Sequence, residues 1–194
     1  VPMDASLDDK RPVLVSRPNG AIAEEFRRIH TNIDFLQTDR TEGVGQLLVI
    51  TSAQPFEGKT TMAINTAVAL AEDGAKVLLI DADLRHPSVA HHLGIEGAAG
   101  LVHVLSGQMS PKDVVQSYWK TNLHILPGGK RPANAGVLLN SETMKLMVEQ
   151  ALTQYDYVII DTAPLTVSND GAVFGRWAKG LLLVVSRNVC EKKS

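Results

Sequence analysis

A short loop near residue 55 carries residue types that bind phosphate. Residues 53–61 read AQPFEGKTT and directly follow the apolar run at 47–52. Because residues 62–73 have a helical pattern, the chain passes from a strand through a tight loop into a helix, whose first N–H groups attract anions. We expect the Lys59 ammonium to reach the outer phosphates of a nucleotide and the Thr60 hydroxyl to bind Mg²⁺. The residues predicted to contact the nucleotide here are Pro55, Phe56, Glu57, Gly58, Lys59, Thr60 and Thr61.

One position of the loop departs from G-x-x-x-x-G-K-[ST], the usual pattern of phosphate loops. The first residue is Ala53, where the pattern has glycine. Alanine tolerates fewer backbone conformations than glycine, so we expect Ala53 to keep a negative φ. An ordinary Gly-Lys turn that only caps a helix is the alternative, and acids at two later strand ends argue against it.

Three aspartates follow apolar runs farther along the chain. Residues 78–85 read LLIDADLR, with Asp81 and Asp83 at the end of the run, and residues 157–164 read YVIIDTAP, with Asp161 in the same place. The carboxyl ends of parallel strands face a common crevice, and a divalent cation would relieve the repulsion between carboxylates gathered there. A lone aspartate at a strand end more often caps a turn, but two such strands beside a phosphate loop favour function. The predicted catalytic residues are Lys59, Asp81, Asp83 and Asp161, and the predicted metal ligands are Thr60, Asp81, Asp83 and Asp161.

Strand-like and helix-like segments alternate along the chain. Strands are expected at 46–51, 76–80, 122–126, 157–160 and 181–186, and a loop at 128–136. Helices are expected at 21–37, 59–72, 141–153 and 169–177, with shorter ones near 87–94, 100–105 and 111–116. The strands are nearly continuous Val, Ile and Leu runs, which are typical of a parallel sheet covered on both faces. We predict an α/β fold with a doubly wound, mainly parallel sheet flanked by helices, an extended arm or linker at 1–20 and one domain at 21–194.

Composition narrows the class of protein. The 194-residue chain has a formal net charge of −2, and 5 % of its residues are aromatic. Neither the charge nor the aromatic content is typical of a nucleic-acid-binding protein, so we expect no nucleic-acid partner. The apolar runs are too short to span a bilayer, and residues 1–10 lack the apolar core of a signal peptide. The single cysteine, Cys190, suits a reducing compartment, so we expect a cytoplasmic protein.

The motifs together resemble the bacterial tyrosine kinases of capsule and exopolysaccharide synthesis, which are P-loop NTPases related to the ParA and MinD ATPases. Residues 52–61 fit the family pattern S-A-x-P-x-E-G-K-[ST]-T, residues 81–85 fit D-x-D-x-R, and residues 161–164 fit D-T-x-P. The resemblance covers roughly residues 20–187. It implies that the chain binds ATP and Mg²⁺ and transfers a phosphoryl group to tyrosine.

The resemblance also implies roles for single residues. A tyrosine hydroxyl has an ordinary pKa near 10, so the transfer needs a carboxylate and a metal ion close by. In the family, one acid of the second motif aids this deprotonation while the acids together organise Mg²⁺, and the sequence leaves open whether Asp81 or Asp83 does so. Arg85, the last residue of that motif, is predicted to contact the nucleotide.

Gln54 separates the chain from the related ATPases. ParA and MinD proteins carry a lysine five residues before the loop lysine, and here that position is Gln54. Two other functions nevertheless stay open. One is a ParA/MinD-like ATPase switch, and the other is a non-catalytic ATP-binding module that organises polysaccharide export.

A helix near the start resembles a subunit contact of the family, E-x-x-R-x-x-R. Glu24, Arg27 and His30 occupy its positions, and a mostly neutral histidine would weaken a salt bridge at pH 7. A solvated helix face with pairs inside the helix is the alternative. The resemblance further implies a homo-oligomer, a transmembrane activator or polysaccharide co-polymerase domain as partner, and a place at the inner face of the plasma membrane.

The family usually ends in a flexible tail that is rich in tyrosine. The three tyrosines of this chain are Tyr118, Tyr155 and Tyr157, and none lies near Ser194. We therefore expect a domain that either is truncated at its C-terminal end or has lost this tail, and that can phosphorylate another chain but not a tail of its own.

Overall fold

In the computed structural model, which describes residues 11–36, 43–178 and 181–186, six strands form one sheet. The strands are β1 (Gln46–Ser52), β2 (Val77–Asp81), β3 (Gln116–Tyr118), β4 (Lys120–Leu126), β5 (Tyr157–Asp161) and β6 (Leu182–Val184). Their order in the sheet is β3-β4-β2-β5-β1-β6. Neighbours from β4 to β6 pair in parallel, and only β3 pairs antiparallel among the described strands. The predicted α/β fold with a mainly parallel sheet is therefore confirmed.

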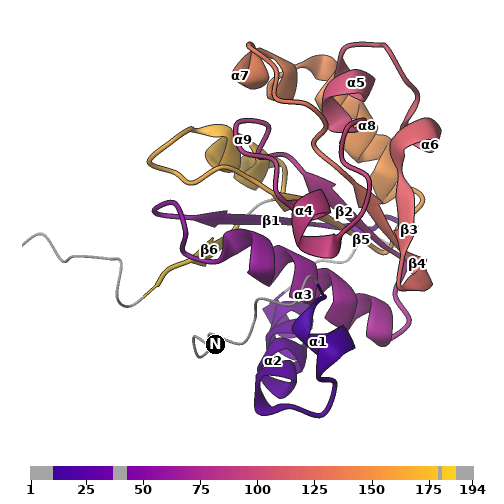
Figure 1. Cartoon of the computed structure of the whole chain (residues 1–194), viewed down its shortest axis with the longest axis vertical. Coiled ribbons are helices and arrows are strands. Elements are labelled where there is room, and N and C mark those ends of the chain that lie inside the picture. Colours follow the sequence, from indigo (N-terminus) through magenta and orange to yellow (C-terminus); the bar gives the residue numbers. More distant parts are fainter. Residues whose placement is uncertain (1–10, 37–42, 179–180, 187–194) are drawn as a thin grey trace, which may run out of the picture.

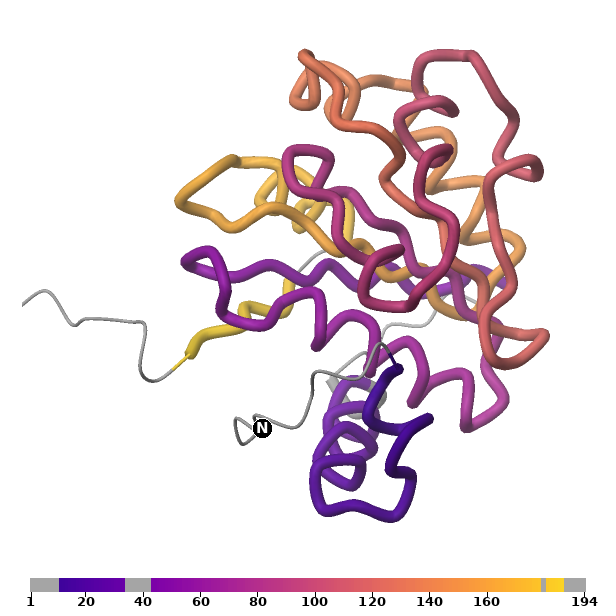
Figure 2. Tube along the Cα trace, in the orientation of Figure 1, coloured from indigo at the N-terminus to yellow at the C-terminus, as the bar shows by residue number. Residues whose placement is uncertain are grey.

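Helices cover both faces of this sheet (Figure 1). The helices are α1 (Val13–Ser16), α2 (Ala21–Leu36), α3 (Lys59–Glu72), α4 (Val89–Leu93), α5 (Leu101–Leu105), α6 (Pro111–Val114), α7 (Ala135–Leu139), α8 (Glu142–Leu152) and α9 (Asp170–Trp177). Helix α3 lies against one face and carries α1 and α2 on its outer side, whereas α8 and α9 lie on the other face. In the tube of Figure 2, the indigo N-terminal helices lie on one side and the orange segment that contains α7 and α8 lies on the other.

Two hydrophobic cores result, one on each face of the sheet. In β2, Leu79 packs with α3 and the N-terminal helices, whereas Leu78 and Ile80 pack with α8 and α9 on the opposite side. This alternation follows from the two-residue period of a strand. Because both faces are covered, all five residues of β2 are buried, which explains its continuous apolar run.

The main helices form where the sequence pattern places them. Helix α3 begins at Lys59 and ends at Glu72, and Gly74 follows with a φ of 96°, a conformation that glycine adopts readily. Helix α8 begins after Ser141, whose hydroxyl oxygen accepts the N–H of Met144 at 3.2 Å as an N-cap. Helix α2 ends at Leu36 in the described part of the chain, and Gln37 lies outside it.

The extended arm predicted for residues 1–20 is wrong where it can be compared. Residues 1–10 lie outside the described ranges, and Val13–Ser16 form α1. Val13 and Leu14 are buried, and the N–H of Val13 donates to Oδ1 of Asn65 on α3 at 2.8 Å. A single helical turn is too short to show a 3.6-residue period, so only this packing reveals it. The boundary at residue 21 between an arm and a domain stays a prediction.

Several shorter elements also differ from the prediction. The helix expected at 111–116 ends at Val114, and the chain then forms β3, which pairs with β4. The loop expected at 128–136 gives way to α7 at its end, and β4 begins two residues early, at Lys120. These elements have three to seven residues, so their type depends on what packs beside them more than on local pattern.

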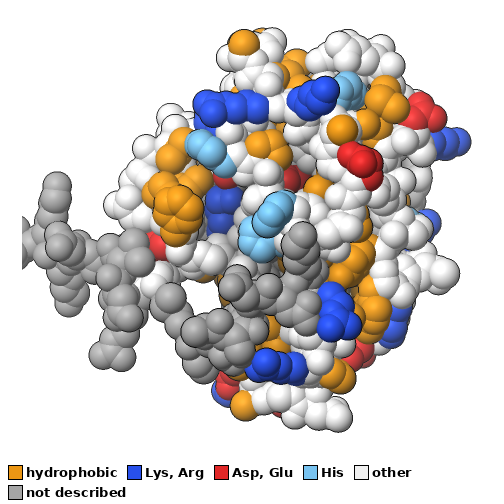
Figure 3. Space-filling view, in the orientation of Figure 1, with side chains coloured by type: hydrophobic (Ala, Val, Ile, Leu, Met, Phe, Trp, Pro, Cys, Tyr) orange, Lys and Arg blue, Asp and Glu red, His pale blue; other side chains and the backbone are white. Residues whose placement is uncertain are grey.

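The surface of the described residues mixes charged and apolar side chains, as the face in Figure 3 shows. Phe56, in the loop between β1 and α3, is the most exposed of the large apolar residues, at 100 %. Within the described ranges, no helix has the length and apolar character needed to cross a membrane.

Candidate active site

The carboxyl ends of β1, β2 and β5 meet at one edge of the sheet, because β5 lies between the other two strands. Asp81 ends β2 and Asp161 ends β5, and the two residues are partners in the register of the ladder. Strand β1 leads into the loop at 53–58 and then into α3, whose first residues are Lys59 and Thr60. Parallel pairing therefore brings together side chains that lie about a hundred residues apart in the chain.

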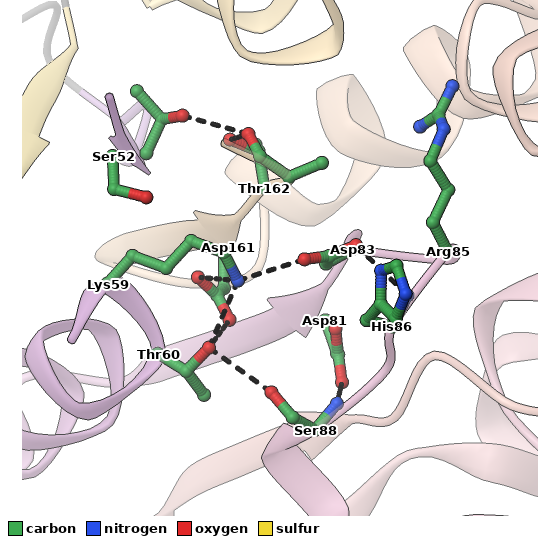
Figure 4. A network of polar contacts seen from close by, with 12 residues as sticks. Ser52, Lys59, Thr60, Asp81, Asp83, Arg85, His86, Ser88, Asp161 and Thr162 are labelled. Carbon is green, nitrogen blue, oxygen red and sulfur yellow. Dashed lines mark hydrogen bonds and ion pairs between the residues drawn. The ribbon is translucent and has the colours of Figure 1, made fainter. Parts of the chain in front are cut away.

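Lys59 points into a group of buried carboxylates (Figure 4). Its Nζ lies 3.0 Å from Oδ2 of Asp83 and 3.7 Å from Oδ1 of Asp161. Both acids are almost fully buried, and Asp83 also accepts the backbone N–H of His86 at 3.1 Å. Two carboxylates therefore hold the ammonium at the edge of the sheet where the phosphate loop ends.

Thr60 is tied to the same group through its hydroxyl. The hydroxyl donates to Oδ2 of Asp161 at 2.7 Å and lies 3.2 Å from the hydroxyl of Ser88. The Nζ of Lys59 lies 3.2 Å from the hydroxyl oxygen of Thr60. The Thr60 hydroxyl thus connects the start of α3 with the end of β5 and with the segment after β2.

The two carboxylate oxygens of Asp81 differ in their hydrogen bonds. Its Oδ2 accepts the backbone N–H groups of Ser88 and Val89, at 2.9 and 3.0 Å. Its Oδ1 is buried and accepts no hydrogen bond from the described residues, and the same holds for Oδ1 of Asp161. Two buried carboxylate oxygens without hydrogen bonds are costly unless something else at the site satisfies them.

Burial and mutual repulsion change the protonation of these groups. Burial, with the Asp161 charge as the next cause, raises the pKa of Asp81 to about 7. Burial also raises the pKa of Asp161 to about 6, although the Lys59 charge and the Thr60 hydrogen bond act in the opposite direction. For Lys59, burial lowers the pKa, but attraction to Asp161 and Asp83 outweighs it and leaves the pKa above its ordinary value.

The residues present suit a magnesium ion that arrives with a nucleotide. In the part of the chain that the structure describes, no three His, Cys, Asp or Glu side chains form a ready-made metal cluster. Mg²⁺ is usually held by one or two carboxylates together with substrate phosphates and water, so such a cluster is not required. The two buried oxygens of Asp81 and Asp161 are the groups that a cation would satisfy. The ligand roles of Thr60, Asp81, Asp83 and Asp161 stay predictions.

The phosphate loop has the backbone geometry of an anion-binding turn. Phe56 and Gly58 have positive φ values, 65° and 86°, and left-handed residues of this kind occur in turns whose successive N–H groups face an anion. Besides glycine, the described residues with positive φ are Phe56 and Trp119, so the expectation of a negative φ at Ala53 is confirmed.

Glu57, although predicted among the nucleotide-binding residues, directs its carboxylate into the protein. Its side chain accepts the backbone N–H of Gln54 at 2.6 Å and that of Ser186 at 3.1 Å. The carboxylate therefore closes the loop on itself and ties it to the end of β6. A nucleotide contact of Glu57 would have to come from its backbone.

Arg85, the other predicted nucleotide contact, points away from Lys59 (Figure 4). Its guanidinium pairs with the buried carboxylate of Asp170, which also accepts the hydroxyl of Ser168. Arg85 thus joins the segment after β2 to the start of α9. A contact of Arg85 with nucleotide stays a prediction.

Two residues of this region were missed in the sequence. Ser88 follows Pro87 and reads as the start of a short helix, and Asp170 reads as an acid in the first turn of another. Their local patterns signal helix starts only. Their partners come from other strands, so no spacing in the sequence indicates them.

The helix residues predicted for subunit contact have partners inside the chain. Arg27 forms two bonds with the carboxylate of Glu72 on α3, at 2.8 and 3.0 Å, and also pairs with Glu24. Nε2 of His30 lies 4.0 Å from Oδ2 of Asp73. Of these contacts, the Arg27–Glu24 pair lies inside the helix, as the alternative expected, whereas the contacts with Glu72 and Asp73 join α2 to the end of α3. A role in oligomers stays a prediction.

Comparisons with known proteins agree with this geometry. A family model described as an AAA domain matches residues 45–173. The tyrosine-protein kinase YwqD of Bacillus subtilis is 40 % identical over 181 residues, which cover 93 % of this chain and 75 % of YwqD. The succinoglycan biosynthesis transport protein ExoP of Rhizobium meliloti is 34 % identical over 94 % of this chain, which spans only 24 % of ExoP.

Solved structures also resemble this chain. The chimerical protein CapA2B2 has a TM-score of 0.89 and 30 % identity, covering 98 % of this chain and 80 % of its own. The kinase domain of the Escherichia coli tyrosine kinase ETK has a TM-score of 0.86 and 31 % identity, covering 95 % and 74 %. The septum site-determining protein MinD of Pyrococcus horikoshii, complexed with Mg-ADP, has a TM-score of 0.60 and 26 % identity, covering 72 % and 57 %.

Proposed function

The chain belongs to the family of bacterial tyrosine-protein kinases, and on that premise we propose that it is an ATP-dependent protein-tyrosine kinase domain. The observation that carries the proposal is the convergence of Lys59 and Thr60 with three buried acids at the carboxyl ends of β2 and β5. Phosphoryl transfer depends on positioning and on charge stabilisation more than on covalent chemistry, and this group of side chains supplies both.

In this proposal each residue has a defined task. The N–H groups of the loop at 53–58 hold the phosphates, and Lys59 leaves Asp83 to stabilise charge on the transferred group. Thr60, with the acids, would hold Mg²⁺, which when bound neutralises charge on the phosphate oxygens. Either Asp81 or Asp83 accepts the proton of the tyrosine hydroxyl.

We further propose that the domain acts in capsule or exopolysaccharide synthesis. The likeness to ExoP, a transport protein of succinoglycan biosynthesis, supports this role. The partner would be a transmembrane activator or polysaccharide co-polymerase domain, which would hold the kinase at the cytoplasmic face of the plasma membrane. Self-association into a homo-oligomer would bring one chain's tyrosines to another chain's site.

Labelled ATP supplied with a tyrosine-rich peptide tests the activity. Phosphotyrosine on the peptide supports the kinase, release of free phosphate alone supports an ATPase switch, and binding without turnover supports a non-catalytic module. Lys59→Met should lower transfer at least about 100-fold, because it removes charge stabilisation from the transferred group. Lys145→Met, which removes an exposed lysine of α8, is the matched control and should transfer normally. Transfer by Lys59→Met at the wild-type rate would contradict the site assignment.

A further inference from the structure

Ser88, which directly precedes α4, connects two parts of the site (Figure 4). Its backbone N–H donates to Oδ2 of Asp81 at 2.9 Å, and its hydroxyl oxygen lies 3.2 Å from that of Thr60. Ser88 belongs to the segment after β2, whereas Thr60 opens α3. The serine is half-buried, and its hydroxyl faces Thr60 in the site.

The hydroxyl of Ser88 is not used to cap its own helix. A serine at this position usually accepts an N–H of the first helical turn, as Ser141 does from Met144 at the start of α8. The side chain of Ser88 makes no such bond at the start of α4. The hydroxyl is directed at Thr60 instead, which indicates a role in the site.

Counting protons fixes the direction of these bonds. Thr60 has a single hydroxyl proton, and Oδ2 of Asp161, at 2.7 Å, is an acceptor that takes it. Ser88 therefore donates its own proton to the Thr60 oxygen, at 3.2 Å. The lone pairs of Ser88 remain available, and they belong to an oxygen next to a predicted metal ligand.

The separation of the two hydroxyl oxygens suits a shared cation. Mg²⁺ binds oxygen at about 2.0–2.1 Å in near-octahedral geometry, which places adjacent ligand oxygens about 3 Å apart. The oxygens of Ser88 and Thr60 are 3.2 Å apart. Hydroxyl ligands would also fit the absence of a three-acid metal cluster among the described residues.

We propose that Ser88 is a further oxygen ligand of the Mg²⁺ ion that accompanies the nucleotide, next to Thr60. This inference rests on the proposed function, because it requires a nucleotide and its metal ion at this site. Its backbone N–H keeps Asp81 in place at the same time, so one residue serves the metal and the neighbouring acid through different atoms.

Ser88→Ala tests the hydroxyl alone, because the backbone N–H to Asp81 remains. The measurement is the binding of a fluorescent ATP analogue as Mg²⁺ is titrated, repeated in EDTA at higher analogue concentrations. The Mg²⁺ concentration at half-maximal binding should rise about fivefold, the effect of one lost polar contact, with unchanged affinity in EDTA. Ser88→Thr keeps a hydroxyl and should stay within about twofold of the wild type.

Ser141→Ala is the matched control, since it removes the hydroxyl of a serine that does cap its helix. It should lower the Tm by about 2–4 °C and leave the Mg²⁺ midpoint unchanged. Ser88→Ala should instead raise the Mg²⁺ midpoint and leave the Tm unchanged. A wild-type midpoint for Ser88→Ala, or an equal loss of affinity in EDTA, would overturn the role of Ser88 and leave the kinase assignment standing. Wild-type protein that binds no nucleotide with Mg²⁺ would overturn both.

Discussion

Neutralising Asp81 should stabilise the metal-free protein while removing its transfer activity. Asp81 is 1 % exposed, its Oδ1 accepts no hydrogen bond, and Asp161 is its neighbour across the ladder. The pKa of Asp81 in the folded protein, about 7, lies above the ordinary value of 3.8. The folded protein therefore holds the proton more tightly than the unfolded chain does. The stability from this group is complete below about pH 4 and is lost as the pH rises through about 7.

The size of the effect follows from that difference in pKa. At 1.36 kcal/mol per unit, the gap between 3.8 and about 7 is worth about 4 kcal/mol above pH 7 and about 2 kcal/mol at pH 5.5. Asp81→Asn removes the charge but keeps an oxygen for the N–H groups of Ser88 and Val89. Its free energy of unfolding should therefore exceed the wild-type value by up to about 4 kcal/mol at pH 7.5, and by about half as much at pH 5.5.

Urea unfolding in EDTA at the two pH values measures this difference, and labelled ATP with the peptide measures transfer. Asp113→Asn is the matched control. The exposed carboxylate of Asp113 accepts hydrogen bonds from Ser110, which lower its pKa, so neutralising it should reduce stability. An Asp81→Asn protein that is less stable than the wild type at pH 7.5 would refute the reasoning. It would mean that hydrogen bonds to the charged carboxylate outweigh the cost of its burial.

Two further variants test the frame around the site. Arg27→Ala should lower the free energy of unfolding by about 1 kcal/mol, because the two-bond pair with Glu72 is partly exposed and links α2 to α3. In the same urea series Arg28→Ala, which loses an exposed pair on one helix, should change little, and equal losses would contradict this view. Phe56→Gly should raise stability by up to about 1 kcal/mol, since glycine relieves the positive φ of an exposed residue. A fall in Tm would instead show that the Phe56 ring stabilises the loop.

The central geometry of the site could be predicted from the sequence because it depends on topology. Once β2 and β5 are read as parallel strands, Asp81 and Asp161 must lie at the same edge of the sheet. Once 53–58 is read as a loop between β1 and α3, Lys59 must face that edge. Such placement needs only the type and order of the elements, and long apolar runs give both.

The partners of single side chains could not be predicted in this way. Arg85 is four residues beyond the end of β2 in the loop, and nothing in its neighbourhood indicates whether it reaches a nucleotide or Asp170, 85 residues later. Glu57 has a phosphate-loop position, yet its carboxylate bonds to backbone at Gln54 and Ser186. These choices depend on distances between elements that the sequence pattern does not contain.

The charges of the site explain why its acids can remain buried. Lys59 supplies one ammonium against the carboxylates of Asp81, Asp83 and Asp161, so ionisation of all three would leave two negative charges unbalanced. Without a metal ion, the raised pKa values of Asp81 and Asp161 reduce this excess by proton uptake. A divalent cation carries the charge needed to replace those protons, and it would free Lys59 for the phosphates. A triphosphate alone would add negative charge to a site that already has too much, so the carboxylates favour a nucleotide that brings its metal ion with it.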